Sequence, residues 1–384
     1  MPHNVANSKE LAGVLKDLQK ADLLFCDRAE SFLQSGFWGG FKARFGWEAL
    51  AFRAVWDNGS NRIEKPLLVL RRRLAPGIAL AYVPWGPELP DSISDGIYAD
   101  CFDARETALR ELAPSLRKLL PRDTVFIRFD IPWYTTEGNS FSFSPPFVRS
   151  VADIQTPDTV LIDLSQSMES VMEQMKPKWR YNARYALKKG VSVRRAGVEQ
   201  LDLFYALLKE TARRDGIAIH GAEYYRALFA SAGTGVASSG HTKIGDANFG
   251  DEYPGQKPDI RLYLAEHEGD VLAGIVTLFR EHMAVYLYGA SSGSKRNLMA
   301  PYALQVLAME DAKASGCVEY DLYGIPPNSE PSHPMAGLYL FKTGFGGKIV
   351  HRPGCWDYPC YNLLYHVYFF AEKVRKGILN RRKR

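Results

Sequence analysis

The order of strand-like and helix-like segments repeats along this chain of 384 residues. In each half, apolar runs separated by turn signals precede a helical stretch, and a short apolar run follows it. In the first half we expect the strands Trp47–Trp56, Leu67–Leu74, Ile78–Val83 and Thr124–Phe129 and the helix Ala104–Leu120. In the second half we expect the strands Arg261–His267, Val271–Arg280, Met283–Gly289 and Val318–Leu322 and the helix Pro301–Ser315. This order predicts an α+β fold in which one kind of unit is used twice.

Between the two sets of strands lies a strongly basic segment, residues 176–195, which holds eight basic residues and no acidic one. Upstream serines can cap a helix and Gly190 can end it, so most of the segment is expected to be helical, with a kink or restart at Pro177. Basic residues recur every four positions and line one face: Lys176, Arg180, Arg184 and Lys188. A buried face is left for Trp179, Ala183, Ala186 and Leu187.

Such a row of like charges does not stabilise a helix, because each pair four residues apart repels by a few tenths of a kcal/mol. We therefore expect a polyanion as its partner: the phosphates of RNA, of a nucleotide or of a lipid headgroup. The alternative is a solvated basic face without a partner.

The positive charge of the chain is concentrated in two segments. The formal net charge is +5 at pH 7, while residues 176–195 carry +8 and residues 372–384 carry +6, which leaves −9 for the other residues. This distribution indicates localised binding of anions. The tail combines aromatic residues with a basic end, as segments at membrane surfaces do, and a disordered, solvated tail is equally compatible with it.

Several protein classes lack support in the sequence. No run reaches the roughly 18 apolar residues of a membrane span, and the N-terminus lacks the apolar core of a signal peptide, so we expect a cytoplasmic protein. The five cysteines include no Cys-x-x-Cys pair, which favours reduced thiols. The eight histidines show no metal-ligand spacing, so neither a metal site nor a redox cofactor is expected.

Eight short motifs stand in a fixed order between residues 30 and 358: Gln34-Ser35-Gly36-Phe37-Trp38 with Lys42, Tyr82-Val83-Pro84-Trp85-Gly86-Pro87, Ile127-Arg128-Phe129-Asp130-Ile131-Pro132, Lys178-Trp179-Arg180-Tyr181-Asn182 through Gly190-Val191, Thr211 with Arg214-Asp215-Gly216, Tyr286-x-Tyr288-Gly289-Ala290-Ser291-Ser292, Tyr320-Asp321-Leu322-Tyr323-Gly324-Ile325, and Phe341-Lys342-x-x-Phe345-Gly346-Gly347. None of them is decisive alone, but the ordered set is specific. It resembles the Fem family of aminoacyl-tRNA-dependent peptidyltransferases, which build the cross-bridges of peptidoglycan.

The resemblance implies two tandem acetyltransferase-like domains with mixed sheets flanked by helices, without the coiled-coil arm of some members. The first domain would comprise residues 1–155 joined by the returning segment 355–384, and the second residues 156–354. The implied activity moves an amino acid from aminoacyl-tRNA to the stem peptide of a peptidoglycan precursor, a lipid-linked or UDP-linked muropeptide. No cofactor is implied, and we expect a monomer that makes peripheral contact with the inner face of the membrane.

The implied chemistry is attack by a peptide amine on the ester of aminoacyl-tRNA. The ester is already activated, so no covalent enzyme intermediate is required. Two catalytic residues follow from the resemblance. Lys342 corresponds to the lysine that approaches the transferred acyl group, where a cation suits a developing oxyanion. Asp130 follows a buried strand and can hold or deprotonate the acceptor amine. The alternatives are a surface lysine on a helix and a turn-capping aspartate before Pro132.

The substrate-binding residues also come from the resemblance. Lys42 corresponds to the lysine that contacts the substrate diphosphate. Tyr286 and Tyr288, which are expected to share one face of a strand, correspond to substrate-binding tyrosines, and Phe341 precedes the catalytic lysine. Aromatic packing in the core is the alternative for the tyrosines.

The chain departs from the family pattern at two places. Trp85 stands where the family often has arginine after Tyr-x-Pro. Near Tyr224-Tyr225, where a phosphate-binding arginine is expected, the chain offers His220, which is only partly charged near neutral pH. Either diphosphate binding is weaker here, or Arg214 or Arg226 takes over the role.

Two other functions remain open at this stage. An acyl-CoA-dependent N-acyltransferase of the same fold would need a glycine-rich pyrophosphate turn. The corresponding residues 296–301 read Arg-Asn-Leu-Met-Ala-Pro, so both glycine positions are filled. The other function is that of a relative without catalytic activity that binds RNA or a membrane.

Overall fold

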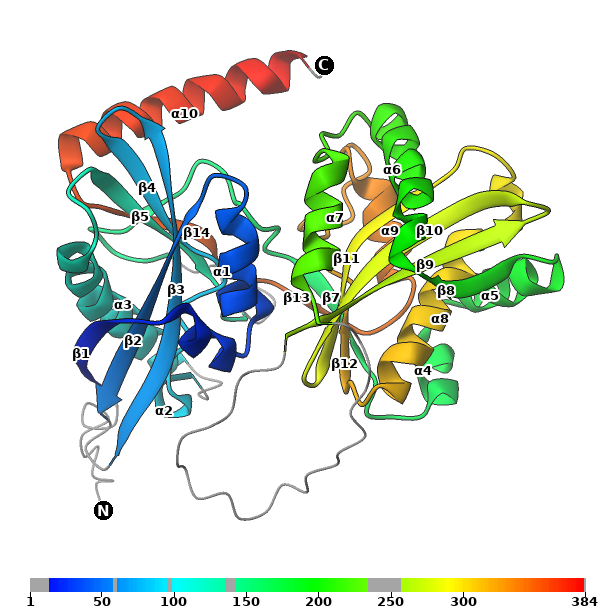
Figure 1. Cartoon of the computed structure of the whole chain (residues 1–384), viewed down its shortest axis with the longest axis horizontal. Coiled ribbons are helices and arrows are strands. Elements are labelled where there is room, and N and C mark those ends of the chain that lie inside the picture. Colours follow the sequence, from blue (N-terminus) through cyan, green and yellow to red (C-terminus); the bar gives the residue numbers. More distant parts are fainter. Residues whose placement is uncertain (1–13, 58–60, 95–98, 135–141, 234–256, 383–384) are drawn as a thin grey trace, which may run out of the picture. The chain divides into compact units, whose positions relative to one another are not determined.

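The computed structural model describes residues 14–57, 61–94, 99–134, 142–233 and 257–382. It divides the chain into two compact units. Unit 1 comprises Met1–Gln155 together with Arg352–Arg384, and unit 2 comprises Thr156–His351. The C-terminal segment therefore returns to unit 1, where its colours, orange and red, stand among the blue and cyan strands (Figure 1).

The elements of unit 1 are, in chain order, β1 (Val14–Ala21), η2 (Leu23–Arg28), η3 (Phe32–Gln34), α1 (Gly36–Ala43), β2 (Glu48–Asp57), β3 (Arg62–Ala75), β4 (Ile78–Val83), α2 (Asp91–Ser94), α3 (Ala99–Leu119), β5 (Thr124–Ile131), β6 (Val148–Arg149), β14 (Gly354–Pro359) and α10 (Asn362–Arg382).

The elements of unit 2 are β7 (Thr159–Asp163), α4 (Met168–Gln174), α5 (Pro177–Lys188), β8 (Ser192–Ala196), η4 (Val198–Gln200), α6 (Leu201–Asp215), α7 (Ala222–Ser231), β9 (Asp259–His267), β10 (Asp270–Arg280), β11 (Met283–Ser291), η5 (Arg296–Leu298), α8 (Ala300–Ala314), β12 (Glu319–Asp321), α9 (Ala336–Thr343) and β13 (Lys348–Val350).

Within the described residues, each unit is built on a seven-stranded mixed sheet of the same plan. The strand order is β1-β2-β3-β4-β5-β14-β6 in unit 1 and β8-β9-β10-β11-β12-β7-β13 in unit 2. The fourth and fifth strands of each order run parallel, namely β4 with β5 and β11 with β12. A parallel pair needs a crossover connection, which α3 and α8 supply. The predicted repetition of one α+β unit is therefore confirmed.

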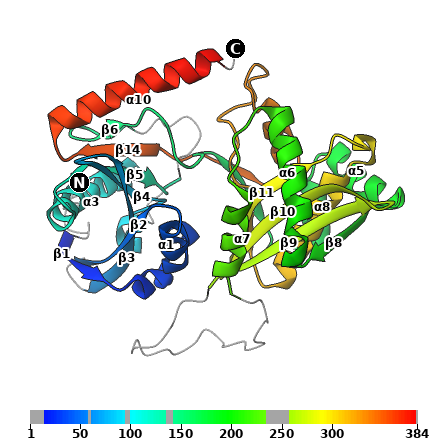
Figure 2. The same ribbon diagram turned by 45° about the horizontal axis from the view of Figure 1, so that its top comes forward.

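Helices cover both faces of each sheet. In unit 1, the face of β5 that carries Ile127 and Phe129 packs in one core cluster with Leu112 and Leu116 of α3. Successive side chains of a strand point to opposite faces, and Phe126 contacts Tyr365 and Tyr368 of α10 on the other face. Every residue of β5 is accordingly buried. In unit 2, α6 and α8 flank the sheet in the same way (Figure 2).

A buried ion cluster fastens the C-terminal segment to unit 1. The guanidinium of Arg128 on β5 donates to both carboxylate oxygens of Asp357 on β14, at 2.7 and 2.9 Å, and to Oε2 of Glu372 on α10, at 3.0 Å. The three side chains are at most 8% exposed. Burial lowers the pKa of Arg128, but the two carboxylates raise it by more, so this residue stays charged. The cluster therefore joins three elements that are distant in sequence.

Most of the expected segments are confirmed, with bounds within a few residues; Ile78–Val83 matches β4 without a shift. The sequence did not predict β1 or α1. The tail, for which a disordered state was an equal alternative, forms α10. Tertiary packing of Tyr365 and Glu372 stabilises this helix, which its local sequence did not indicate.

The ion cluster gives a prediction for stability. Replacing Arg128 by leucine leaves Asp357 and Glu372 buried without a counter-charge, so the free energy of unfolding should fall by about 3–5 kcal/mol. Urea unfolding followed by tryptophan fluorescence measures this, because every tryptophan except Trp179 lies in unit 1. The control is Lys16→Leu, which removes an exposed ammonium 3.8 Å from Asp57 and should cost under about 1 kcal/mol. Equal effects of the two substitutions would contradict the role of the cluster.

Candidate active site

Lys342, in the last turn of α9, is a buried amine and only 6% exposed. Its Nζ donates hydrogen bonds to the backbone carbonyls of Tyr323 and of Gly324, the latter at 3.0 Å, and lies 5.1 Å from the centre of the Tyr286 ring. Burial lowers the pKa of Lys342 to about 7, and the nearby Asp321 carboxylate opposes this shift. The alternative of a surface lysine is therefore excluded by its position, and the amine is set to change protonation near neutral pH.

Asp321 is a site residue that the sequence reasoning missed, although it stands inside one of the quoted motifs. It ends β12 and is fully buried. Its Oδ1 accepts hydrogen bonds from the hydroxyl of Thr159 and from the backbone N–H of Tyr323, the latter at 2.7 Å. Its Oδ2 has no hydrogen-bond partner among the described residues. A buried carboxylate oxygen without a hydrogen-bond partner, near a buried lysine, is unusual in a folded protein. These two residues are therefore candidates for a functional site.

The expectation that Tyr286 and Tyr288 share one face of β11 is wrong. In the pairing with β10, Tyr286 lies opposite Thr277 and Tyr288 lies opposite the neighbouring residue, Val276. One residue of β11 is therefore left over, as a β-bulge between the two tyrosines. Tyr286 packs on the core beside Lys342. Tyr288 instead contacts Tyr225 of α7, at 5.2 Å between ring centres. The alternation of side chains fails at a bulge, which the sequence pattern does not reveal.

The residues expected to bind phosphate in unit 2 lie around α7 and the end of β11. His220 is exposed and stacks on Tyr224 with ring centres 3.8 Å apart. Arg214 donates to the carboxylate of Asp215 at 2.8 Å and to the carbonyl of Ser291 at 2.9 Å. Arg226 is paired with Asp202 at 2.6 Å. Both arginines thus have protein partners, and His220 is joined to the aromatic group that includes Tyr288.

The basic segment forms α5, which restarts at Pro177 in the first turn after α4 has ended. The side chains of Lys176, Arg184 and Lys188 are exposed. Arg180 is half-buried and donates to the carbonyls of Met172 and Glu173, both at 3.1 Å, so its guanidinium also caps the C-terminal end of α4. Leu187, which was expected on the buried face, is 53% exposed; Asn182 occupies that face instead.

Aromatic rings stand among the bases of α5. Tyr181 and Tyr185 are stacked with ring centres 5.7 Å apart. Together with Arg184, Lys188 and Lys189 they line a surface groove of about 330 Å³. A stacked aromatic pair beside three cations is an arrangement that suits an unpaired base and its phosphates.

Trp179 connects α5 with α9 and therefore with Lys342. Its indole N–H donates to the carbonyl of Phe341 at 2.8 Å, and the backbone N–H of Lys176 donates to the carbonyl of Gly344 at 2.9 Å. A Cβ at Gly344 would lie 2.2 Å from the Trp179 ring, so only glycine permits this approach. Phe341 is half-buried and packs on Tyr302 and Phe345, at 5.3 and 5.1 Å. Because its ring and its carbonyl are held by these contacts, Phe341 fixes the place of the next residue, Lys342.

In unit 1, Asp130 lies near the end of β5 and is 1% exposed. Its Oδ2 accepts hydrogen bonds from the hydroxyl of Tyr82, at 2.8 Å, and from the backbone N–H of Gln155, at 3.2 Å. Burial raises the pKa of Asp130 to about 6, although these hydrogen bonds oppose the shift. The carboxyl group can therefore gain and lose a proton near neutral pH.

A series of contacts in unit 1 leads from Lys42 toward Asp130. Burial, and then the charge of Arg72, lower the pKa of Lys42 to about 8, and its Nζ lies 5.4 Å from the centre of the Trp38 ring. Arg72 lies over Trp47, and the Trp47 ring centre is 6.1 Å from that of Tyr82, the hydrogen-bond donor to Asp130. The two cations are thus separated from the buried carboxyl group by the rings of Trp47 and Tyr82.

Trp85, which replaces the arginine of the family pattern, has a cation on its ring. The guanidinium of Arg352 lies 4.1 Å from the centre of the Trp85 ring and 5.0 Å from that of Tyr134. Trp85 also has a left-handed backbone, with φ at 40°. Position 85 lacks the family's arginine, but Arg352 of the returning segment places a positive charge next to it.

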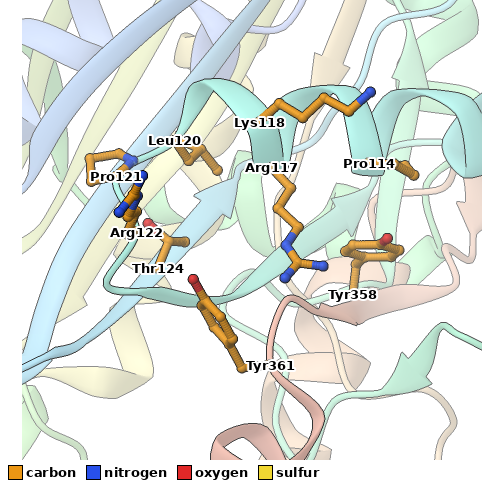
Figure 3. Close-up of a pocket in the computed structure, with 9 residues that line it drawn as sticks. All are labelled: Pro114, Arg117, Lys118, Leu120, Pro121, Arg122, Thr124, Tyr358 and Tyr361. Atoms are coloured by element: carbon orange, nitrogen blue, oxygen red, sulfur yellow. The ribbon is translucent and has the colours of Figure 1, made fainter.

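A second cavity, of about 380 Å³, lies at the end of α3 in unit 1 (Figure 3). Arg117, Lys118 and Arg122 line it together with Tyr361, whose ring lies 5.1 Å from the Arg117 guanidinium. None of the predicted site residues lines this cavity.

In the part of the chain that the structure describes, no group of three or more His, Cys, Asp or Glu side chains could hold a metal ion. Over the same residues, no helix has the length and apolar content that crossing a membrane requires.

Comparison with known sequences finds relatives in staphylococci. The lipid II:glycine glycyltransferase of Staphylococcus epidermidis is 25% identical over 261 residues, which cover 58% of this chain and 62% of that protein. The enzyme of the same name from Staphylococcus haemolyticus is 25% identical over 341 residues, covering 73% of this chain and 81% of that protein. The match to the first relative therefore spans less than two thirds of its length.

Comparison with solved structures gives the crystal structure of FemX, with a TM-score of 0.71 and 17% sequence identity. The match covers 92% of this chain and 100% of that structure. This likeness confirms the expected fold class. The sequence matches the FemAB family over residues 140–236 and 262–373, which confirms the resemblance drawn from the motifs. Since these ranges hold more than half of its residues, the chain belongs to the FemAB family.

Proposed function

We propose that this chain is an aminoacyltransferase that moves an amino acid from aminoacyl-tRNA to the stem peptide of a lipid-linked peptidoglycan precursor. The observation that carries the proposal is the buried Lys342, with its pKa lowered to about 7, which lies 5.1 Å from the centre of the Tyr286 ring and feels the charge of the buried Asp321 carboxylate. Family membership and the names of the two staphylococcal relatives support the reaction class.

In this proposal Lys342 acts on the carbonyl oxygen of the aminoacyl ester. When the acceptor amine attacks, that oxygen gains negative charge, and a protonated Nζ held in place by two backbone carbonyls stabilises it. A cation fixed in a buried place is effective because it needs no rearrangement during the reaction. The tetrahedral intermediate then collapses: the bond to the ribose oxygen breaks, this oxygen takes up the proton that the amine has lost and leaves as the free hydroxyl of the tRNA, and the new amide bond remains.

Asp130 takes the proton of the attacking amine in this proposal. An ammonium group must lose a proton before its nitrogen can attack, and a carboxylate with a pKa of about 6 is suited to accept it near neutral pH. Lys42, with Arg72 beside it, would bind the diphosphate of the acceptor. Further candidates for phosphate contacts are His220, Arg214 and Arg352. His220 or Arg214 would take the role of the arginine that the family pattern leads one to expect near Tyr224, and Arg352 lies beside Trp85, which stands where the family often has another.

The groove on α5 would bind the acceptor end of the tRNA. Arg184, Lys188 and Lys189 meet phosphates there, and an unpaired base stacks on Tyr181 or Tyr185. Since Trp179 ties α5 to α9, binding in this groove would bear directly on the place of Lys342.

An acyl-CoA donor is less well supported. In the turn before α8, Met299 adopts the left-handed φ of 57° that a glycine would take, but it places a side chain there. Pro301, in the first turn of α8, has no backbone N–H to offer a pyrophosphate. A nucleotide-linked acceptor remains the other form of the same reaction.

The first prediction for the proposed function concerns Lys342. Replacing Lys342 by methionine keeps the volume of the side chain but removes the cation, and kcat/KM for transfer should fall roughly a hundredfold or more. Labelled amino acids on a total tRNA pool are offered with lipid-linked or nucleotide-linked muropeptide. The control is Lys348→Met, an exposed lysine of unit 2, which should retain activity. Turnover of acetyl-CoA without transfer to either acceptor would overturn the proposal.

A second prediction follows from the two shifted pKa values. Because Asp130 must be ionised and Lys342 protonated, kcat/KM should rise with pH through about 6 and fall through about 7. In Asp130→Asn the rising limb should be absent, and in Lys342→Arg the falling limb should be absent. A profile that continues to rise above the pKa of Lys342 would show that this amine acts as a base instead.

The groove on α5 gives a third prediction. Replacing Tyr181 and Tyr185 by serine should weaken tRNA binding by about 1–3 kcal/mol for each stacked base. Arg184→Gln and Lys188→Gln should each reduce the slope of log K against log salt by about 1. Lys209→Gln, an exposed lysine on α6, is the control, and binding is followed by filter retention. Unchanged affinity and unchanged slope would remove α5 from the tRNA site.

A further inference from the structure

The C-terminal helix α10 has one face fixed to unit 1. Tyr365 is fully buried, and its hydroxyl donates to Asp357 at 3.1 Å. Seven residues later, on the same side of the helix, Glu372 joins the Arg128 cluster. Nζ of Lys376 donates to the carbonyl of Val151 at 2.5 Å. The orientation of the helix about its own axis is therefore set by contacts along its length.

The opposite face of α10 is an apolar stripe, formed by Leu363, Val367, Phe370, Val374 and Ile378. These side chains are 79%, 63%, 68%, 45% and 49% exposed. Their spacing of four, three, four and four residues keeps them on one line of the helix. The stripe runs for about 22 Å, from the rise of 1.5 Å per residue. So long a row of exposed apolar side chains marks an interaction surface.

Basic residues border the apolar stripe. Lys373 and Arg375 are exposed on its two sides, and the chain continues with Arg381, Arg382, Lys383 and Arg384. The one acidic residue from 362 onward is Glu372, which faces the protein and is bound by Arg128. The outer side of α10 therefore combines apolar side chains with positive charge and holds no acid to oppose it.

We propose that the outer face of α10 binds the surface of a membrane that carries anionic lipids. The apolar stripe enters the boundary between headgroups and acyl chains, and the bases pair with lipid phosphates. Charge complementarity selects this partner over an apolar protein surface, which would leave the bases without counter-charges. The helix lies in the surface and does not cross the membrane. This inference deepens the proposed function, because it gives unit 1 a way to reach a lipid-linked acceptor.

The test is co-sedimentation of the full-length protein with vesicles, in the absence of tRNA and muropeptide. Vesicles of phosphatidylcholine with phosphatidylglycerol should bind the protein, and vesicles of phosphatidylcholine alone should bind it much more weakly. Val367→Ser with Phe370→Ser should lower the affinity at least tenfold. Lys373→Gln with Arg375→Gln should lower it about fivefold for each charge, on the anionic vesicles alone. The matched control is Val198→Ser with Leu203→Ser, which are exposed by 56% and 42% in unit 2.

Thermal unfolding checks that the variants fold, and because all the changed side chains are exposed, their Tm should equal that of the wild type. Sedimentation analysis without vesicles shows whether the stripe instead joins two copies of the chain. Binding that the α10 variants lose and the control retains supports the proposal. Equal binding of all variants, or a dimer that the Val367/Phe370 variant abolishes, overturns it. Vesicle binding requires no transfer activity, so failure of the proposed reaction would leave this result intact.

Discussion

The buried guanidinium of Arg128 is the interaction on which unit 1 depends. It holds Asp357 of β14 and Glu372 of α10 against β5, although more than 200 residues separate the two partners from it. With this charge in place, the C-terminal segment completes the sheet and covers the second face of β5. Two residues further along the same face of the strand stands Asp130, so the cluster that secures the fold also supports the strand that presents the proposed base.

The same architecture is used twice, and each copy ends its fifth strand in a buried carboxylate. Asp130 near the end of β5 and Asp321 at the end of β12 occupy equivalent strands of the two sheets. Their surroundings differ, since Asp130 accepts a hydrogen bond from Tyr82 while Asp321 lies beside Lys342. One sheet plan thereby places a buried carboxyl group on the equivalent strand of each unit, one beside a tyrosine hydroxyl and one near a buried lysine.

In unit 2 the glycines around α9 allow parts of the proposed site to approach closely. Gly344 lets the Trp179 ring of α5 lie against the end of α9. Gly347 has a φ of 80°, and a Cβ added to it would lie 2.4 Å from the carbonyl oxygen of Leu161. A helix that carries exposed bases is thereby joined to the helix that carries the buried lysine. Contacts to backbone carbonyls thus connect the surface that we propose for tRNA with the lysine that we propose for catalysis, and a rigid connection would favour precise placement of the ester.

The sequence by itself determined the repeated α+β order, an interruption of the helix at Pro177, the two basic segments and the family, because these follow from local periodicity, composition and ordered motifs. It also pointed to Lys342 and Asp130 as residues, without their protonation. Only the tertiary structure decided that Tyr286 and Tyr288 lie on different sides of a bulge, that Leu187 is exposed, that a buried Asp321 lies near Lys342 and that the tail is a helix with an apolar outer face. Burial, pKa values and helix orientation depend on atoms that distant parts of the chain bring together, and no local pattern contains that information.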